Sequence, residues 1–359
     1  MVTEERFGIL EDGREITQYT ITNKYGESVG LLNYGAAIHS LNVRKEDGKV
    51  GDVVLGAEKA ADLTEYTFEG VTIGRCANRI ANGRYTWKGK TYQLEQNKGV
   101  HFMHGACGNY AHQMFSAQYR KNGNSVIFGF RDTGKGGFDC EAEVQIKFSF
   151  NDRHCLSILY EITPAKDTLV CPTNHAYFNL TDKNDIRKHT LRINACYAAI
   201  KDAEGIPHGE IRNVSCTNAD FQQFRDIGSA MEQGKEETGK IPFTYDEYYL
   251  LRDSSRPAAE IYAPDTKRIM RVYTDMPGLI LFTPYETKAR TGKNGEVYQG
   301  YCAVCLETQY IPNAVNCPGF LKPIVLANQT FRSKTSYIFD VIDEKKIMKE
   351  QVGVTYEQK

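Results

Sequence analysis

Two polar residues at the end of an apolar run are the first candidates for chemistry in this chain. Glu307 and Gln309 follow the apolar segment 301–306 and precede a turn rich in Pro, Asn and Gly. In an extended strand, residues two apart project from the same face, so the carboxylate and the amide would point together. A carboxylate beside apolar neighbours is costly to bury unless it is paired. The pattern is typical either of a functional carboxylate or of a structural charge paired with an arginine.

A second polar cluster lies in the sequence CPTNHAYFNLTD, residues 171–182. Read as a strand, it places His175, Tyr177 and Asn179 on one face and the apolar residues between them on the other. An imidazole, a phenol and an amide in a row favour a small-molecule site. The alternative is an ordinary edge strand whose polar residues face water.

A third segment, residues 72–108, adds further polar candidates. It contains the pair Asn78 and Arg79, a hairpin-like KGK turn at 88–90, and His104 followed by glycine. The planar guanidinium of an arginine can grip neighbouring hydroxyls of a small molecule or orient a carboxylate. Each residue also has a structural interpretation: His104 as a turn cap, and Arg79 as a partner for a carboxylate such as Glu307.

Four motifs in these segments resemble the aldose 1-epimerase (galactose mutarotase) family. The block at 74–99, GRCANRIANGRYTWKGKTYQLEQNKG, resembles the family's GRxANRIxxGxFxLxGxxYxLxxNxG. MHGACG at 103–108 resembles its LHGG, TNHAYFNL at 173–180 its NHxYFNL, and LETQYIPNAVN at 306–316 its ETQxxPDAxN. The motifs occur in the family's order, and the resemblance covers roughly residues 10–340.

The resemblance implies a role for each matched residue. Glu307 matches the family's general base and His175 its general acid. His104 matches the histidine that hydrogen-bonds near the ring oxygen of the sugar. Asn78 and Arg79 match the family's sugar-binding pair.

A further sugar-binding match and several departures leave the preferred sugar open. Asp246, in TYDEYYLL, matches an Asp that holds sugar hydroxyls, but Glu247 follows it where relatives often have His. Ile280 occupies the place of a Gln that contacts sugar, and an aliphatic side chain cannot hydrogen-bond a hydroxyl. Asn313 occupies a position where the family commonly has Asp, and His101 occupies one where Asn is typical.

Interconversion of the anomers of a free sugar needs one base and one acid. The base takes the proton of the C1 hydroxyl while the acid protonates the ring oxygen, and both transfers reverse after the aldehyde rotates. An ordinary Glu, with a pKa of about 4.3, and an ordinary His, with a pKa of about 6.5, approximately meet this need at neutral pH. We therefore expect no cofactor and no metal.

Cysteine and histidine spacing does not favour zinc. The only CxxC pair, Cys302 and Cys305, would project its sulfurs to opposite faces of a strand, and the same parity separates His101 from His104. We expect the ten cysteines to be reduced thiols.

The composition of the chain argues against some classes of binding partner. The net charge is -1 with both signs interspersed, which argues against nucleic acid or an anionic membrane as the main partner. The apolar stretches are strand-sized and the start of the chain lacks a signal-peptide pattern. We expect a cytoplasmic monomer or homodimer whose partner is a monosaccharide.

Periodicity of two dominates the chain and predicts an all-β protein. Segments 141–150, 155–162, 191–200 and 332–340 read as strands, whereas helical patterns are short, at 218–225 and 229–233. We expect a large antiparallel β-sandwich, the galactose mutarotase-like super-sandwich of the family, as a single domain over 1–340. The charged tail 341–359 reads as a terminal helix or a loose end.

Three other functions remain open on sequence alone. A mutarotase of a phosphorylated or unusual sugar would need extra cations in the cleft, such as Arg131 or Lys135. A non-catalytic sugar-binding module would keep Arg79 and Asp246 without needing both proton-transfer residues. A glycoside hydrolase would need a second facing carboxylate, for which Asp246 is the motif-borne candidate.

Overall fold

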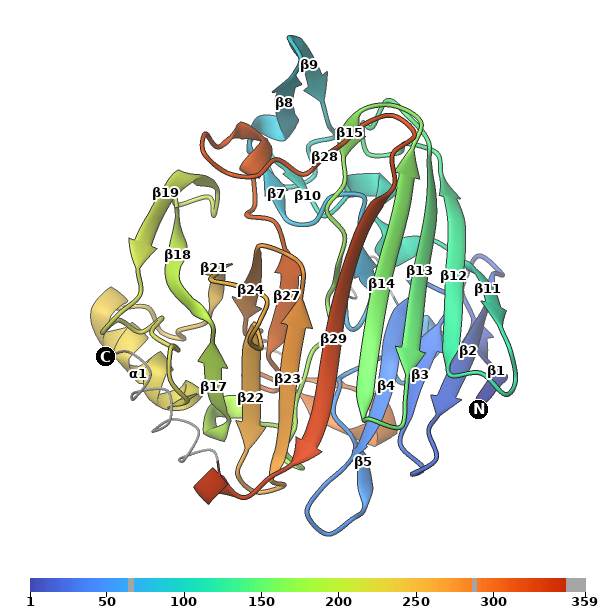
Figure 1. Cartoon of the computed structure of the whole chain (residues 1–359), viewed down its shortest axis with the longest axis vertical. Coiled ribbons are helices and arrows are strands. Elements are labelled where there is room, and N and C mark those ends of the chain that lie inside the picture. The colour runs from blue at the N-terminus through green and yellow to red at the C-terminus, as the bar shows by residue number, and fades with distance from the viewer. Residues whose placement is uncertain (64–67, 286–288, 347–359) are drawn as a thin grey trace.

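Three antiparallel sheets form the body of the protein, and they pack into two layers around a shared core. The structure, a computed structural model, describes residues 1–63, 68–285 and 289–346. Figure 1 shows the long strands β14 and β29 side by side near the middle of the view, to the right of the shorter strands β24 and β27. The predicted β-sandwich is confirmed.

The largest sheet forms one layer. In spatial order its strands are β11 (Ser116–Tyr119), β12 (Ser125–Asp132), β13 (Ala142–Phe150), β14 (Cys155–Pro164), β29 (Phe331–Val341), β23 (Arg268–Thr274), β22 (Ala259–Ala263), β17 (Thr190–Ile193) and β20 (Arg225–Asp226).

Two five-stranded sheets form the second layer. The N-terminal sheet has the order β1 (Val2–Ile9), β2 (Glu15–Thr22), β3 (Ser28–Leu32), β4 (Ala37–Arg44) and β5 (Val50–Asp52). The other sheet has the order β19 (Pro207–Asn213), β18 (Ala195–Lys201), β21 (Asp246–Leu251), β24 (Gly278–Phe282) and β27 (Cys305–Gln309).

Short ladders and helices complete the described chain. The two-stranded ladders pair β6 (Thr72–Ile73) with β16 (Thr173–Asn174), β7 (Arg79–Ile80) with β10 (Phe102–Met103), β8 (Arg84–Trp87) with β9 (Lys90–Gln93), β15 (Thr168–Leu169) with β28 (Ile324–Val325), and β25 (Arg290–Thr291) with β26 (Val297–Tyr298). The helices are α1 (Ile227–Thr238) and short 3₁₀ helices at Ala60–Asp62, Ala81–Gly83, Ala106–Gly108, Tyr110–His112, Ile186–Lys188, Lys293–Gly295 and Ala314–Asn316. Within these described residues, no helix is long and apolar enough to cross a membrane.

Alternating burial explains why the predicted strands form. In β13, buried and exposed residues alternate along the strand, and Val144, Ile146 and Phe148 lie in the main core. An apolar face of this kind can only be buried against a second layer, so the period-two pattern produces a sandwich. The strands predicted at 155–162 and 332–340 are confirmed as β14 and β29.

Two local predictions are wrong. Segment 191–200 was expected to be one strand, but it breaks at Asn194, whose backbone N–H donates to Ala258 O, and β17 and β18 join different sheets. Segment 218–225 is not helical, because the Asp220 carboxylate accepts backbone N–H bonds from Cys216 and Gln222 and ties the chain into turns.

The second predicted helix, 229–233, is confirmed within α1. The Asp226 carboxylate caps the first turn of α1 by accepting the Ser229 N–H, and Gly239 ends the helix with a φ of 69°. The charged tail was predicted over 341–359. Strand β29 ends at Val341, and residues 347–359 lie outside the described residues.

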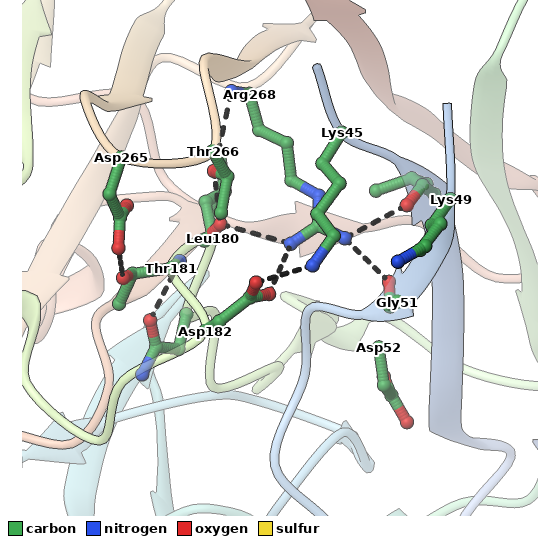
Figure 2. A network of polar contacts seen from close by, with 12 residues as sticks. Lys45, Lys49, Gly51, Asp52, Leu180, Thr181, Asp182, Asp265, Thr266 and Arg268 are labelled. Atoms are coloured by element: carbon green, nitrogen blue, oxygen red, sulfur yellow. Dashed lines mark hydrogen bonds and ion pairs between the residues drawn. The ribbon is translucent and has the colours of Figure 1, made fainter. Parts of the chain in front are cut away.

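A buried arginine joins the two layers. Figure 2 shows the Arg268 side chain, 1% exposed, at the start of β23 among oxygen atoms of three other chain segments. Its guanidinium donates to Val43 O (3.0 Å), Gly51 O (3.3 Å) and Leu180 O (3.2 Å). Asp182 supplies the nearest carboxylate, at 3.5 Å. Arg268 therefore fixes the end of segment 173–180 against the N-terminal sheet.

We expect Arg268→Met to destabilise the protein by about 3 kcal/mol or more, because it leaves several buried carbonyls without a donor. Urea unfolding measures this loss. The matched control is Arg332→Met, since Arg332 on β29 forms an exposed ion pair with Glu161 and should contribute little. Equal losses in the two variants would contradict a special role for Arg268.

Candidate active site

The strands β21, β24 and β27 present their polar side chains on the face away from the main core. Their register aligns Tyr248, Ile280 and Glu307 in one row across the three strands. Asp246 begins the next row, two residues along, and so projects from the same face. The intervening residues, such as Leu306, enter the core. The alternation of side chains that packs Leu306 of β27 into the core therefore also directs Glu307 to the opposite face.

His175 is brought to Glu307 by the segment that follows β16. The Phe178 N–H donates to Val304 O (2.8 Å) and the Val304 N–H donates to Phe178 O (2.9 Å), so this segment runs antiparallel beside β27. His175 Nε2 lies 3.4 Å from Glu307 Oε1. The two residues are 6% and 3% exposed. The acid and base candidates predicted from separate motifs therefore meet.

His104 is locked to Asn78 by two reciprocal bonds. The ladder of β7 with β10 aligns Met103 with Arg79 and brings the next residues together. The His104 N–H donates to Asn78 O (3.1 Å), and the Asn78 N–H donates to His104 Nδ1 (3.1 Å). Because Nδ1 accepts a bond, the neutral ring carries its proton on Nε2. His104 is therefore a hydrogen-bond donor at Nε2.

Asn78 turns the chain so that Arg79 can reach the cleft. Asn78 adopts a φ of 60°, which Asn tolerates better than most residues, and its Oδ1 accepts the Arg79 N–H (2.9 Å). Arg79 Nη1 lies 3.8 Å from Asp246 Oδ2. A small pocket is lined by Asn78, Arg79, Asp246 and Ile280, among others.

Lys201 is a pocket residue that the sequence motifs did not reveal. Its Nζ lies 3.4 Å from Asp246 Oδ2 and 3.9 Å from Glu247 Oε1, and it lines the same pocket as Arg79. Asp246 therefore has a cation on each side. Lys201 lies at the end of β18, in a segment without any matched motif, so only the pairing of β18 with β21 places it here.

Aromatic rings enclose the two histidines. The ring of Phe68 stacks on His175 with centroids 6.0 Å apart, and Tyr177 stacks on it at 5.0 Å. Phe282, from the strand beside Glu307, meets His175 edge-on at 5.9 Å. These rings shield the acid–base pair from bulk solvent. Sequence reasoning identified Tyr177 but not Phe68 or Phe282, because an isolated Phe gives no signal distinct from core packing.

Burial reverses the expected order of proton affinities. Burial, together with the charge of Asp246, raises the pKa of Glu307 to about 8, although Arg79 acts in the opposite direction. Burial lowers the pKa of His175 to about 4, against the raising influence of Asp246, and that of His104 to about 3, assisted by His175 and Arg79. The sequence suggested an ionised Glu and a protonated His. These shifts instead favour a protonated Glu307 beside a neutral His175 near neutral pH.

Asn313 explains one departure from the family pattern. Its side-chain Nδ2 donates to Pro207 O (2.9 Å), and its Oδ1 accepts the Ala81 N–H (3.1 Å). An ionised Asp could not donate to Pro207 O. Asn313 therefore ties the turn after β27 to β19 and to the segment after Arg79.

Other sequence candidates lie elsewhere. Asn179 donates to Lys183 O and Cys302 O, and its amide is therefore used within the fold. His101 accepts the Asn82 N–H and lies 3.2 Å from Glu204. Arg131 pairs with Glu141 on the surface of β12. Across residues 1–63, 68–285 and 289–346, no three His, Cys, Asp or Glu side chains are grouped as a metal site.

Comparisons with known proteins agree with this arrangement. The aldose 1-epimerase family model matches residues 17–338. The aldose 1-epimerase of Escherichia coli is 30% identical over 339 residues, which cover 92% of this chain and 97% of that protein. The galactose mutarotase of Rattus norvegicus is 31% identical over 346 residues, with 95% and 99% covered.

Solved structures show the same fold. The crystal structure of an aldose epimerase homologue from C. elegans superimposes with a TM-score of 0.83 at 25% identity, covering 90% of this chain and 98% of that one. A galactose 1-epimerase from Lactobacillus acidophilus gives 0.82 at 23% identity, covering 95% and 98%. The chain belongs to the aldose 1-epimerase family, whose members are isomerases.

We expect Glu307→Gln to stabilise the protein at alkaline pH. Below pH 4.5 the carboxyl is protonated in both the folded and the unfolded wild type, so the variant gains no pH-dependent advantage. Because the folded pKa is the higher one, wild-type stability falls as pH rises from 4.5, and the loss is complete above about 8. Urea unfolding at pH 4.5, 7 and 9 should show a difference in unfolding free energy between variant and wild type that widens to a few kcal/mol.

The control for this prediction is Glu161→Gln, on the partly exposed face of β14. It should show no gap that grows with pH. A constant difference between Glu307→Gln and wild type from pH 4.5 to 9 would mean that Glu307 titrates as an ordinary glutamate.

Proposed function

We propose that this protein interconverts the α and β anomers of free aldoses by acid–base ring opening and closure. The observation that carries the proposal is the contact of 3.4 Å between His175 Nε2 and Glu307 Oε1, two side chains that are buried from solvent. The family membership supports the same reaction, and the named relatives are aldose 1-epimerases and galactose mutarotases.

In the proposed reaction Glu307 takes the proton of the C1 hydroxyl while His175 protonates the ring oxygen. These transfers break the C1–ring oxygen bond and leave an aldehyde, a protonated Glu307 and a neutral His175. After rotation about the C1–C2 bond, the ring oxygen attacks the other face of the aldehyde, and both protons return. Each positioned transfer is worth about 10²–10⁴ in rate, so the pair needs no metal.

The buried pair suits the open-chain stage of this reaction. Ring opening leaves Glu307 protonated and His175 neutral, which is the state that burial favours. The cyclic sugar instead requires a proton to pass from Glu307 to His175 across their contact. The reactive form, with an ionised Glu307 and a protonated His175, is therefore the less populated form of the pair near neutral pH.

The remaining residues are assigned to sugar binding. His104 donates from Nε2 to the sugar near the ring oxygen, since its lowered pKa keeps it neutral. Asn78, Arg79 and Asp246 bind hydroxyls along the pocket. Asp246 suits this task because its carboxylate is partly exposed while Arg79 and Lys201 hold it from two sides.

A phosphorylated sugar is the alternative substrate, and it would need cations in the pocket, such as Arg79 and Lys201. The pocket holds two cations, but Lys201 lies between the carboxylates of Asp246 and Glu247. Arg212 is also paired with Glu247. The positive charge is therefore largely offset, which favours an uncharged aldose.

We place the activity in the cytoplasm, as a monomer or homodimer without nucleic-acid or membrane partners. The near-zero net charge supports this proposal, as do ten free thiols, which suit a reducing compartment.

Glu307→Gln should reduce mutarotation by at least about 10²-fold, because a neutral amide cannot take the C1 proton. Polarimetry of freshly dissolved α-D-glucose and α-D-galactose in metal-free buffer measures it. The wild-type kcat/KM should follow a bell with limbs near pH 4 and pH 8, the pKa values of His175 and Glu307. Glu161→Gln is the control, and wild-type rates in Glu307→Gln would disprove the mechanism.

Free aldoses should be turned over faster than their 6-phosphates. Lys201→Met should weaken binding of the free sugar, seen as a higher KM, because Asp246 loses one of the cations that orient it. A preference for the phosphorylated sugar that disappears in Lys201→Met would instead assign Lys201 to a phosphate group.

A further inference from the structure

Two buried polar side chains beside the acid–base pair lack partners. Gln309 is 0% exposed and Thr173 is 1% exposed. Within the described residues, the Gln309 Nε2 and Oε1 atoms and the Thr173 Oγ1 atom make no hydrogen bond. Such groups are rare in folded proteins because each costs free energy when left unsatisfied. They require an explanation beyond packing.

The register of the neighbouring segments places these side chains. The bridge of Phe178 with Val304 is antiparallel, with a hydrogen bond in each direction. Continued along both segments, this register opposes His175 to Glu307, in agreement with their contact of 3.4 Å. Two residues further, the same register opposes Thr173 to Gln309.

Thr173 and Gln309 therefore form a second row next to the acid–base pair. In extended segments, residues two apart share a face, so Thr173 lies on the same face as His175, and Gln309 lies on the same face as Glu307. The strands β16 and β27 are in contact, as this register requires.

A tyrosine separates this second row from the pocket. Gly278 is the cross-strand neighbour of Gln309, and the phenol of Tyr248 lies across it. A Cβ atom at Gly278 would lie 2.3 Å from the Tyr248 hydroxyl, which donates to Gln309 O (3.2 Å). Tyr248 lines the sugar pocket, whereas Gln309 does not. Gln309 thus acts through its neighbours rather than on the sugar.

Glu307 also has a carboxylate oxygen without a partner. Its Oε1 faces His175, and its Oε2 is buried without a partner in the described chain. We propose that Thr173 and Gln309 are positioning residues that together hold one interior water, and that this water hydrogen-bonds to Glu307 Oε2. The inference rests on the role proposed above for Glu307.

A shared water accounts for all of these atoms at once. Buried waters make two to four hydrogen bonds to polar groups that are otherwise unsatisfied. No direct bond joins Gln309 or Thr173 to Glu307, and polar groups beyond hydrogen-bond distance are commonly bridged by a water. With Oε2 held, the carboxyl group cannot rotate, and Oε1 stays directed at His175.

The water also affects the ionisation of Glu307. Donation to a carboxylate is stronger than donation to a neutral acid, so the water favours the ionised form. The other titratable groups around Glu307 come from several elements and stay unchanged in the variants below: His175, Arg79, Asp246, Cys305 and Tyr337.

The test uses Thr173→Val, Gln309→Met and the double variant, which keep the side-chain volumes nearly constant. Carbon-13 NMR of glutamate carboxyl groups follows Glu307 in the sugar-free protein, and Glu307→Gln assigns its signal. Each single change should raise the pH midpoint of Glu307 by about half a unit or more. The double variant should shift it no further, because both residues hold the same water. The value of kcat should fall at least threefold with little change in KM.

Thr308→Val is the matched control. Thr308 lies between Glu307 and Gln309 but faces the other layer, where its hydroxyl is bonded to Thr335 (2.7 Å). Its loss should leave the Glu307 midpoint unchanged. Should Gln309→Met fail to fold, Thr173→Val alone carries the test, since a shift in its midpoint is still required.

Two results would overturn the inference. An unchanged midpoint in Thr173→Val and Gln309→Met, with a more stable Gln309→Met protein, would make Gln309 only an unsatisfied amide. Additive shifts in the double variant would mean separate contacts without a shared water. Both readouts are obtained without sugar, so a wild-type protein that fails to accelerate mutarotation would disprove the proposed function and leave this test intact.

Discussion

Burial of the Glu307 carboxyl group beside the His175 ring is the interaction on which the site depends. Apolar and aromatic neighbours withdraw both groups from water, and each charged form is thereby disfavoured. If the pair were solvated, the glutamate would be ionised near neutral pH and the histidine would keep a pKa close to its ordinary value. In the proposed reaction, burial therefore favours the open-chain stage, in which Glu307 is protonated and His175 is neutral.

Holding two such groups in contact requires rigid elements on both sides. Glu307 lies within β27, whose alternate residues pack into the main core. His175 lies in a less regular segment, which is fastened at Phe178 by its bridge to Val304 and near Leu180 by Arg268. The fold therefore confines the irregular segment at two places, and a contact of 3.4 Å can be maintained without a regular strand at His175.

The polar residues around the pair divide into those that touch the pocket and those that support it. Arg79, Lys201 and Asp246 line the pocket and balance one another's charge. Asn313 connects backbone groups behind them. This division explains why departures from the family pattern differ in consequence: Asn313 changes a structural bond, whereas Ile280 removes a polar group from the row of Glu307.

The sequence by itself determined the layered β fold and the family, and it predicted the six candidate site residues that the structure brings together. Period-two alternation directly records which face of a strand is buried, and the motifs stand in family order. Tertiary structure decided the rest. Lys201, Phe68 and Phe282 join the site only through packing between distant segments. The break between β17 and β18 at Asn194 likewise depends on pairing with distant strands. The raised pKa of Glu307 depends on burial and on neighbours far along the chain, which no local pattern encodes.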